Sequence, residues 1–175
     1  MLIFKTSKGD VKIELYADKA PETVKNFMTY VNEGFFNGTI FHRVIKNFMV
    51  QGGGFDTGFK EKANHASIKN EADNGLSNKR GAIAMARTME PHSAGSQFFI
   101  NLVDNDYLDF QSATPRGYGY CVFGQVVEGM DVMDAIAKVK TGRRGMHDDV
   151  PVENVVVNSV EVVEKFLITR LDTNR

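Results

Sequence analysis

Short runs of alternating apolar and polar residues dominate this sequence, and only two stretches carry the apolar spacing of a helix. Residues 2–15 predict a β-hairpin, because two alternating runs flank the turn sequence SKGD at 7–10. The segment 39–52 contains two such runs, divided at Lys46–Asn47. Further strands are predicted within 80–87, 96–102, 119–127 and 152–164.

The two helical stretches are residues 20–34 and 130–139. In the first, Pro21 suits a first helical turn, apolar residues recur at i, i+3, i+4 and i+7, and Gly34 can end the helix. The apolar residues of the two predicted helices are Val24, Phe27, Met28, Val31, Met130, Met133, Ile136 and Ala137. Many short strands with two helices predict a β-barrel or a β-sandwich whose open ends the helices cover, and the pattern alone does not choose between them.

Three long glycine-rich and polar connections separate these elements, at residues 52–80, 87–95 and 104–119. Connections of this length inside a domain usually carry function. We therefore expect binding or catalysis to involve them.

Composition limits the classes of function. The chain has 175 residues, which predicts one domain, and its 42% hydrophobic and 25% charged residues are typical of globular proteins. A net charge of −1 argues against nucleic-acid binding, and no apolar run approaches a membrane span. The single cysteine, Cys121, excludes an internal disulfide, and its apolar neighbours predict a buried thiol. With no visible signal peptide, these features predict a cytoplasmic protein.

One charged residue stands out, Arg43 in FHRVIKNFMVQGGGF at residues 41–55, a stretch that contains no acidic residue. An ordinary explanation is an arginine that reaches solvent from a strand edge, or that pairs with a distant acid such as Glu71. Another explanation follows from Gln51 and Gln97, which stand beside aromatic residues in predicted strands. With Phe48, Met49, Phe98 and Phe99, these polar residues would form an apolar groove with a few fixed donors, as in a ligand site.

Other chemistries have weaker support. The glycines at 52–54 are not followed by the Lys-Ser/Thr of a phosphate-binding loop, so a tight turn or bulge is the better interpretation. The four histidines, His42, His65, His92 and His147, lack the spacing of a metal site. Ser93 lacks the glycine spacing of a nucleophile elbow.

Four segments resemble the successive signatures of the cyclophilins, a family of peptidyl-prolyl cis-trans isomerases: FHRVIKNFMVQGGGF, NEADNGLSNKRGAIAMAR, HSAGSQFFIN and GYCVFGQVVEGMDVMDAI. The resemblance covers about residues 2–163, and TGRRGMHDDVP makes the chain most similar to the small cytoplasmic cyclophilins of bacteria. It implies a mainly β protein, a closed eight-stranded antiparallel β-barrel capped by two α-helices. Residues 1–164 would form the isomerase domain, followed by an extension at 165–175 without an assigned role.

The implied activity is rotation about X-Pro peptide bonds in peptides and in unfolded or flexible protein segments, which assists protein folding and needs no cofactor or metal. Arg43 and Gln51 match the catalytic positions of the family. The matching substrate-binding positions are Phe48, Met49, Ala86, Arg87, Gln97, Phe99, Tyr107, Leu108 and Tyr120. An alternative is a proline-peptide binding module or chaperone with little turnover.

Some matched positions depart from the eukaryotic pattern. Tyr107 replaces a tryptophan, so cyclosporin is expected to bind weakly, and Tyr120 replaces a histidine but can still form a wall of the proline pocket. Arg87 replaces an asparagine in the segment expected to bind the peptide backbone, and the loop 88–95 is one residue longer. The expected partners are proline-containing peptides and unfolded clients rather than nucleic acid or membrane, and the chain is expected to be a monomer.

Overall fold

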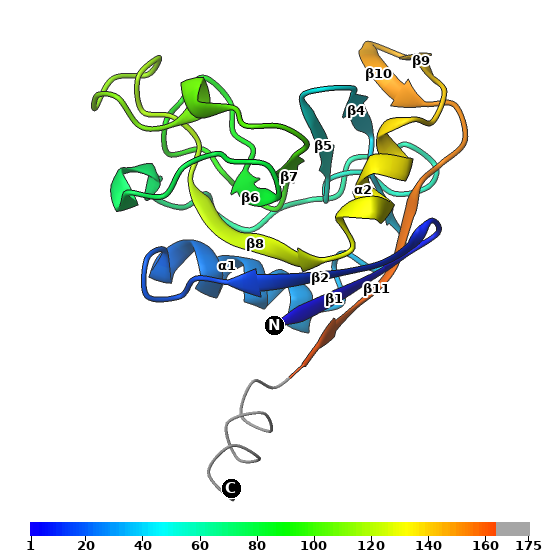
Figure 1. Cartoon of the computed structure of the whole chain (residues 1–175), viewed down its shortest axis with the longest axis horizontal. Helices are drawn as coiled ribbons and strands as arrows, with labels where there is room; N and C mark the ends of the chain where they lie inside the picture. The colour runs from blue at the N-terminus through cyan, green and yellow to red at the C-terminus, as the bar shows by residue number, and fades with distance from the viewer. Residues whose placement is uncertain (164–175) are drawn as a thin grey trace, which may run out of the picture.

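A single curled antiparallel sheet organises the protein, and its strands follow the alternating segments of the sequence (Figure 1). The computed structural model describes residues 1–163, so the predicted extension at 165–175 lies outside the described residues. Short 3₁₀ helices occupy Ala72–Asn74 and Asp106–Leu108. The strands are β1 (Leu2–Thr6), β2 (Gly9–Leu15), β3 (Thr39–Ile40), β4 (Arg43–Ile45), β5 (Met49–Gly52), β6 (Ala82–Met85), β7 (Phe98–Asn101), β8 (Val122–Glu128), β9 (Thr141–Arg144), β10 (His147–Pro151) and β11 (Val156–Val162).

The order of strands in the main sheet is β3-β11-β1-β2-β8-β6-β7-β5-β4. The predicted hairpin is its β1–β2 pair, in which Leu2 lies opposite Ile13. The first and last strands of the order, β3 and β4, are separated in the chain by two residues only. The sheet therefore curls round so that this short segment links its two ends, which gives a barrel-like sheet.

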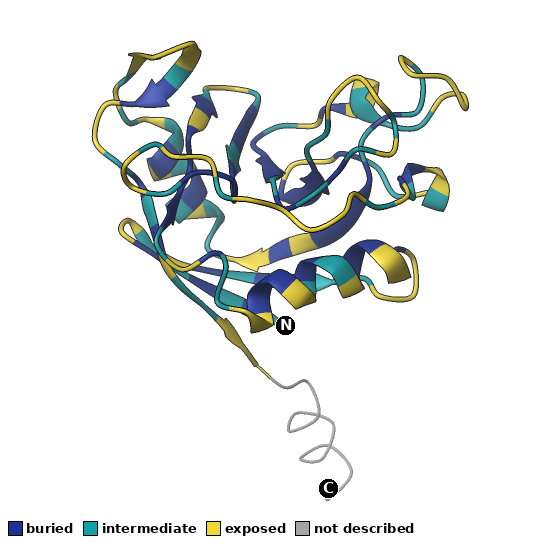
Figure 2. Ribbon diagram, turned by 180° about the vertical axis from the view of Figure 1, so that it is seen from behind, coloured by how far each residue is buried: buried dark blue, intermediate teal, exposed yellow. Residues whose placement is uncertain are grey.

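Both predicted helices are present, α1 (Pro21–Asn32) and α2 (Met130–Ala137). α1 begins with the proline that sequence reasoning placed in its first turn, and it buries Phe27 against aromatic rings of β1, β7 and β8. α2 packs on β2, β4 and β5 and buries Met133 and Ile136. Figure 2 shows α1 with its buried stripe toward the sheet and its exposed residues outward.

The prediction of a mainly β fold with an antiparallel barrel and two helices is confirmed. The main sheet counts nine strands instead of eight, because the segment 39–45 contributes two very short strands at opposite ends of the order. A separate two-stranded sheet, β9–β10, was not predicted. Every residue from Gly142 to Asp148 is exposed, and the hairpin buries only Val150 and Pro151 at its end, which is too little to leave an apolar alternation in the sequence.

Strands β5, β6 and β7 are buried on both faces. Ile83, Met85, Phe98 and Ile100 belong to the large core inside the curled sheet, which also contains Phe27. The alternate residues of the same strands, Met49, Ala82, Ala84 and Phe99, form a second apolar cluster on the outer face together with Val122 of β8. Because successive strand residues point to opposite faces, one set of strands supplies both clusters.

Within residues 1–163, no helix has the length and apolar character needed to cross a bilayer.

Candidate active site

Strand register sets Arg43, Gln51 and Phe99 in one row across the outer face of the sheet. Arg43 lies opposite Gln51 in the β4–β5 pair, and Gln51 lies opposite Phe99 in the β5–β7 pair. Phe99 in turn lies opposite Ala84 on β6. The row therefore runs from a cation at the edge of the sheet, over an amide, to an apolar floor.

A chain of hydrogen bonds orients the cation. Arg43 Nη1 donates to Gln51 Oε1 at 3.3 Å, and Gln51 Nε2 donates to Gln97 Oε1 at 2.9 Å. A guanidinium has five N–H donors, and within residues 1–163 this is the one hydrogen bond that Arg43 makes. The remaining donors are available to a ligand.

Arg43 has no acidic partner among the described residues. The carboxylate of Glu71, considered from sequence as a distant partner, instead accepts from the main-chain N–H and the hydroxyl of Thr23, both at 2.7 Å. That alternative for Arg43 is therefore wrong. The positive charge faces the pocket without a fixed counter-ion.

An apolar pocket of about 140 Å³ opens beside the guanidinium. Its floor is the outer cluster containing Met49 and Phe99, and Tyr120 stands edge-on to Phe99 with ring centroids 5.7 Å apart. Leu108 projects from the 3₁₀ helix of the 104–119 connection, which agrees with the expectation that this connection contributes to function. The residues that line the pocket are Arg43, Phe48, Met49, Gln51, Ala86, Arg87, Phe99, Leu108 and Tyr120.

Two sequence-predicted site residues lie just outside this pocket. Gln97 borders a neighbouring hollow and reaches the site through its hydrogen bond with Gln51. Tyr107 is 65% exposed and stacks on Phe48, with centroids 6.3 Å apart and planes 16° apart. The prediction that Phe98 lines the groove is wrong. Phe98 is fully buried in the inner core, because its side chain points to the face of β7 opposite to that of Phe99.

The glycines at 52–54 form a tight bend, as predicted, and they allow other groups to approach the backbone. Gly53 has φ +87°, a conformation that side chains disfavour. A Cβ on Gly54 would lie 2.5 Å from Gln97 Nε2, so the bare backbone leaves room for the amide that supports Gln51.

The guanidinium of Arg87 binds the loop behind the pocket. It donates to the carbonyls of Gly119 and Thr88, each at 2.9 Å, and to that of Pro115 at 3.2 Å. It also lies 4.7 Å from the centre of the Tyr120 ring, a cation–π distance. The Arg87 side chain thus holds Tyr120 and the 111–119 loop.

A second hollow of about 200 Å³ continues the groove past Gln97. It shares Gln51, Ala86 and Arg87 with the first pocket, and its further residues, among which only Gln97 was predicted as a site residue, fall in or near the connections 52–80 and 87–95 that were expected to be functional. The residues that line only this hollow are Glu61, Asn64, Thr88, Ser93, Gly95, Ser96 and Gln97. Its lining is polar, in contrast to the apolar floor beside Arg43.

Two buried groups near the site have strongly shifted pKa values. His42 is 4% exposed, and burial, followed by the nearby His147 and Arg43, lowers its pKa to about 4. Cys121 is buried as predicted, and burial raises the pKa of its thiol to about 11, although a hydrogen bond with Thr23 acts in the opposite direction. Cys121 is therefore a poor nucleophile at neutral pH.

Among residues 1–163, no three His, Cys, Asp or Glu side chains converge in an arrangement that could hold a metal ion. The chemistry available in the groove is that of a fixed cation with free N–H donors, two linked amides and an apolar pocket. Such a site can bind an extended peptide with a ring-shaped apolar side chain and donate hydrogen bonds beside it.

Comparison with known proteins gives consistent results. The family model described as cyclophilin type peptidyl-prolyl cis-trans isomerase/CLD matches residues 1–162. The chain is 61% identical over 164 residues to peptidyl-prolyl cis-trans isomerase B of Escherichia coli, a match that covers 94% of this chain and 100% of that protein. It is 54% identical over 158 residues to peptidyl-prolyl cis-trans isomerase cyp18 of Streptomyces antibioticus, covering 90% and 95% of the two chains.

A solved structure shows the same fold. The Cryptosporidium parvum cyclophilin type peptidyl-prolyl cis-trans isomerase, crystallised in the presence of the dipeptide Ala-Pro, superposes with a TM-score of 0.80 at 25% sequence identity. The match covers 94% of this chain and 99% of that chain.

Proposed function

This chain belongs to the cyclophilin-type peptidyl-prolyl cis-trans isomerases, and from its groove we propose how the residues divide the work of isomerisation. The protein is an enzyme that catalyses rotation about X-Pro peptide bonds. The barrier to this rotation is about 20 kcal/mol, because twisting the bond removes amide resonance. The rotation makes and breaks no covalent bond, so stabilising the twisted amide is the task of the site.

Arg43 is the residue that acts on the twisted amide. As the amide twists, the prolyl nitrogen becomes pyramidal and regains a lone pair that neither planar ground state offers. A guanidinium donor aimed at this lone pair binds the transition state more tightly than the substrate. The observation that carries this assignment is Arg43 on the rim of the pocket, with one donor bonded to Gln51 and the others free of partners among residues 1–163.

Gln51 and Gln97 keep the guanidinium in place. Their hydrogen bonds reach from β5 to β7, so the orientation of Arg43 depends on rigid strands on both sides. Arginine suits this task because its donors form a planar fork, whereas the ammonium of lysine is a mobile point charge.

The pocket supplies the rest of the catalysis. A hydrogen bond to a charged group contributes about 1.5–3 kcal/mol, or about 10- to 150-fold in rate. An acceleration on the order of 10⁵ needs about 7 kcal/mol. We assign the remainder to enclosure of the proline ring by Phe48, Met49, Phe99, Leu108 and Tyr120, which removes water from the amide and anchors one side of the rotation.

Substrate peptides bind along the groove in an extended conformation. The main-chain N–H of Ala86 already donates to the carbonyl of Gln97 at 3.0 Å, so pairing with the peptide backbone depends on the main chain of Arg87. The polar hollow beyond Gln97 receives the residues that precede proline. The exposed Tyr107 lacks the indole donor of tryptophan, which supports weak binding of cyclosporin.

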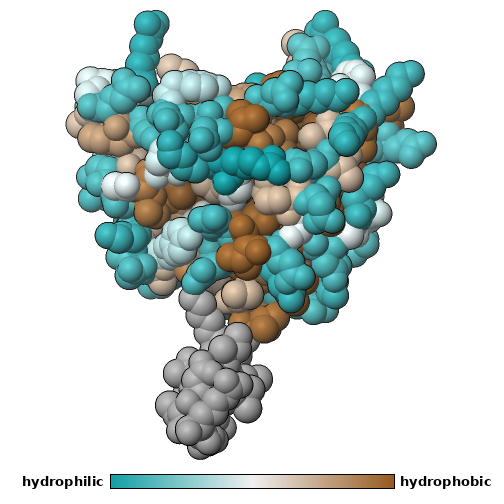
Figure 3. All heavy atoms as spheres, viewed as in Figure 1, coloured by the Kyte–Doolittle hydropathy of each residue, from teal (hydrophilic) through white to brown (hydrophobic). Residues whose placement is uncertain are grey.

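We further propose a cytoplasmic monomer that assists the folding of proline-containing clients. A single buried cysteine supports a reducing compartment. On the face shown in Figure 3, apolar residues form small patches separated by hydrophilic ones, which supports the monomer.

Exchange NMR on an Ala-Pro peptide tests the assignment of Arg43. The wild-type protein should accelerate cis-trans exchange, and Arg43→Ala should lower kcat/KM about 10- to 150-fold with the melting temperature almost unchanged. Arg143→Ala is the matched control, because it removes an exposed arginine of β9 whose distance to Asp148 is 4.0 Å. Near-normal activity of Arg43→Ala would remove that residue from its role. A wild-type protein that binds the peptide without accelerating exchange would be a binding module.

A further inference from the structure

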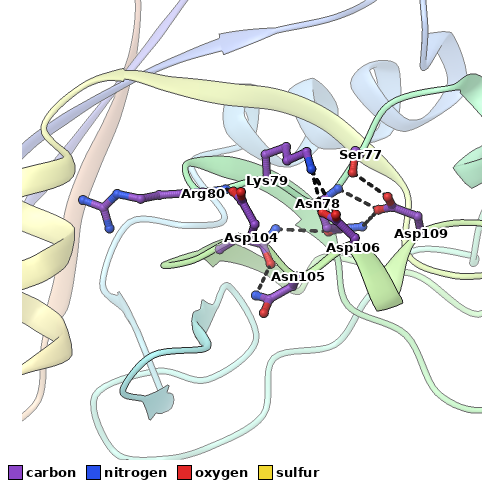
Figure 4. A network of polar contacts seen from close by, with 9 residues as sticks. Ser77, Asn78, Lys79, Arg80, Asp104, Asn105, Asp106 and Asp109 are labelled. Atoms are coloured by element: carbon purple, nitrogen blue, oxygen red, sulfur yellow. Dashed lines mark hydrogen bonds and ion pairs between the residues drawn. The ribbon is translucent and has the colours of Figure 1, made fainter.

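Three asparagines lie buried directly behind the proline pocket: Asn78, Asn101 and Asn105 are 0%, 0% and 3% exposed. None of them lines the pocket. Asn78 precedes β6 and Asn105 follows β7, as Figure 4 shows, and Asn101 is the last residue of β7. Buried amides are costly unless all their donors and acceptors are used, so their partners indicate what they do.

Hydrogen bonds connect Asn105 to two walls of the pocket in a closed ring. Leu108 N donates to Asn105 O at 2.9 Å, and Tyr120 N donates to Leu108 O at 2.9 Å. Asn78 Nδ2 donates to Tyr120 O at 3.3 Å, and Asn105 N closes the ring on Asn78 O at 2.7 Å. The main chains of Leu108 and Tyr120 are thereby fixed relative to each other.

The side chain of Asn105 reaches the third wall. Its Nδ2 donates to the carbonyl of Phe48 at 3.0 Å and to Asn101 Oδ1 at 2.8 Å. The carbonyl of Phe48 also accepts from Leu102 N at 2.9 Å. Phe48 follows Asn47, which has φ +58° in the β4–β5 turn, so the turn is held to the end of β7 by these two donors.

The side chains of Asn78 and Asn101 are tied into the same cluster. Asn101 Nδ2 donates to Asn78 Oδ1 at 3.0 Å, and Asp109 Oδ1 accepts from Asn78 N at 2.7 Å and from Asn78 Nδ2 at 3.0 Å. The other carboxylate oxygen of Asp109 accepts from Ser77 Oγ. A buried network in which all three amide nitrogens donate hydrogen bonds is rigid, and it favours one arrangement of the groups attached to it.

We propose that Asn105 is the positioning residue of the proline pocket: it sets the mutual placement of Phe48, Leu108 and Tyr120, and through them the affinity for the proline ring. This inference rests on the proposed function, in which those three side chains enclose the ring. Asn105 is not a catalytic residue, because it lies behind the walls and does not line the pocket.

The chain of hydrogen bonds that orients Arg43, through Gln51 and Gln97, is separate from the asparagine network. Arg43, Gln51 and Gln97 share no hydrogen bond with Asn78, Asn101 or Asn105. Loss of Asn105 leaves the Arg43 donor and all the side chains that exclude water from the amide in the protein, and it loosens only their fit to the ring, so binding of the ring should weaken in the ground state and in the transition state alike. Uniform loss of binding raises KM and leaves kcat almost unchanged.

Kinetics of Asn105→Ala test the proposal. We expect KM for an Ala-Pro peptide to rise about tenfold and kcat to stay within about twofold, because the Phe48 carbonyl loses one of its two donors and the turn carrying Phe48 is held less firmly. A residue that served only stability would reduce the folded fraction, which lowers apparent kcat at unchanged KM. Thr39→Val is the control, since it removes one hydrogen bond of a fully buried side chain, Thr39 Oγ1 to Phe36 O, away from the pocket.

An unchanged KM for Asn105→Ala would overturn the proposal. If that variant does not fold, Asn105→Asp provides the test, because it keeps the shape and the acceptor but loses both amide donations. Burial raises the pKa of such a carboxyl, and its protonated form can donate to the carbonyl of Phe48 again. The KM of the variant relative to the wild type should then fall as pH is lowered from about 8 to about 5.5, whereas a flat ratio would refute the role. Failure of the proposed function would instead appear as an Arg43→Ala enzyme of normal activity.

Discussion

Protonation of His42 should make the protein sensitive to mild acid. His42 precedes Arg43, is 4% exposed, and packs against Phe55 with ring centroids 4.5 Å apart and against His147 at 6.4 Å. Its Nδ1 is buried without a hydrogen-bond partner. Burial, then the positive charges of His147 and Arg43, lower its pKa from 6.5 to about 4.

The sign of the effect follows from which state binds the proton first. Above about pH 6.5, His42 is neutral in the folded and unfolded chains and contributes nothing to the pH dependence. As pH falls, the unfolded chain is protonated before the folded protein, so stability decreases until both are protonated near pH 4. One pKa unit corresponds to about 1.36 kcal/mol, so the loss is about 2 kcal/mol at about pH 5 and about 3 kcal/mol when complete.

Urea unfolding of the wild type and of His42→Phe between pH 7.5 and pH 4.5 measures this contribution. Phenylalanine fills the same apolar site without a titrating group, so the variant should lack this part of the decline, whatever its absolute stability. His147→Gln should reduce the decline, because it removes one of the charges that depress the pKa of His42. Parallel curves for the wild type and His42→Phe would refute the reasoning, since they would show that His42 binds its proton equally well in both states.

Two further predictions concern the site and the thiol. Gln97→Leu removes the acceptor of Gln51, so Arg43 should be less well oriented. A loss of about 1 kcal/mol should lower kcat about fivefold. Unchanged kcat in the exchange assay would show that the hydrogen bonds from Arg43 through Gln51 to Gln97 do not contribute to catalysis. Cys121 should react with a disulfide reagent at pH 7.5 about a hundredfold more slowly in the folded protein than in urea, because its pKa is raised from 9.0 to about 11, and equal rates would contradict its burial.

Local patterns predicted most of the elements, because their residues alternate between a buried and an exposed face. The segment 39–52 is an example. The predicted break between its two strands, at Lys46–Asn47, coincides with the turn between β4 and β5, in which Asn47 has a positive φ. The β9–β10 hairpin was not predicted, because residues 142–148 are exposed and therefore show no alternation of apolar and polar side chains. The sequence also did not show which of Phe98 and Phe99 faces the pocket. The two adjacent phenylalanines are equally apolar, and only the strand register shows which face each one occupies.

The candidate site was predicted as a set of residues, and the relations among them required the structure. Arg43 and Gln51 are near in sequence, but the amide that supports them, Gln97, lies 46 residues further along the chain. Asn105 carries no local signal of its role, because an asparagine in a polar connection usually faces solvent. Its importance depends on a ring of hydrogen bonds that joins three separate segments.

The two-sided burial of β5, β6 and β7 restricts how substrate choice can change over evolution or in the laboratory. Each residue of the pocket floor has neighbours in its own strand that hold the barrel interior together, so enlarging or reshaping the floor also strains the scaffold. Diversification is easier in the exposed parts of the connections around the groove, residues 88–90 and 111–116, which do not contribute to the interior. New specificities in this enzyme are therefore best sought by exchanging these rim loops above an unaltered floor.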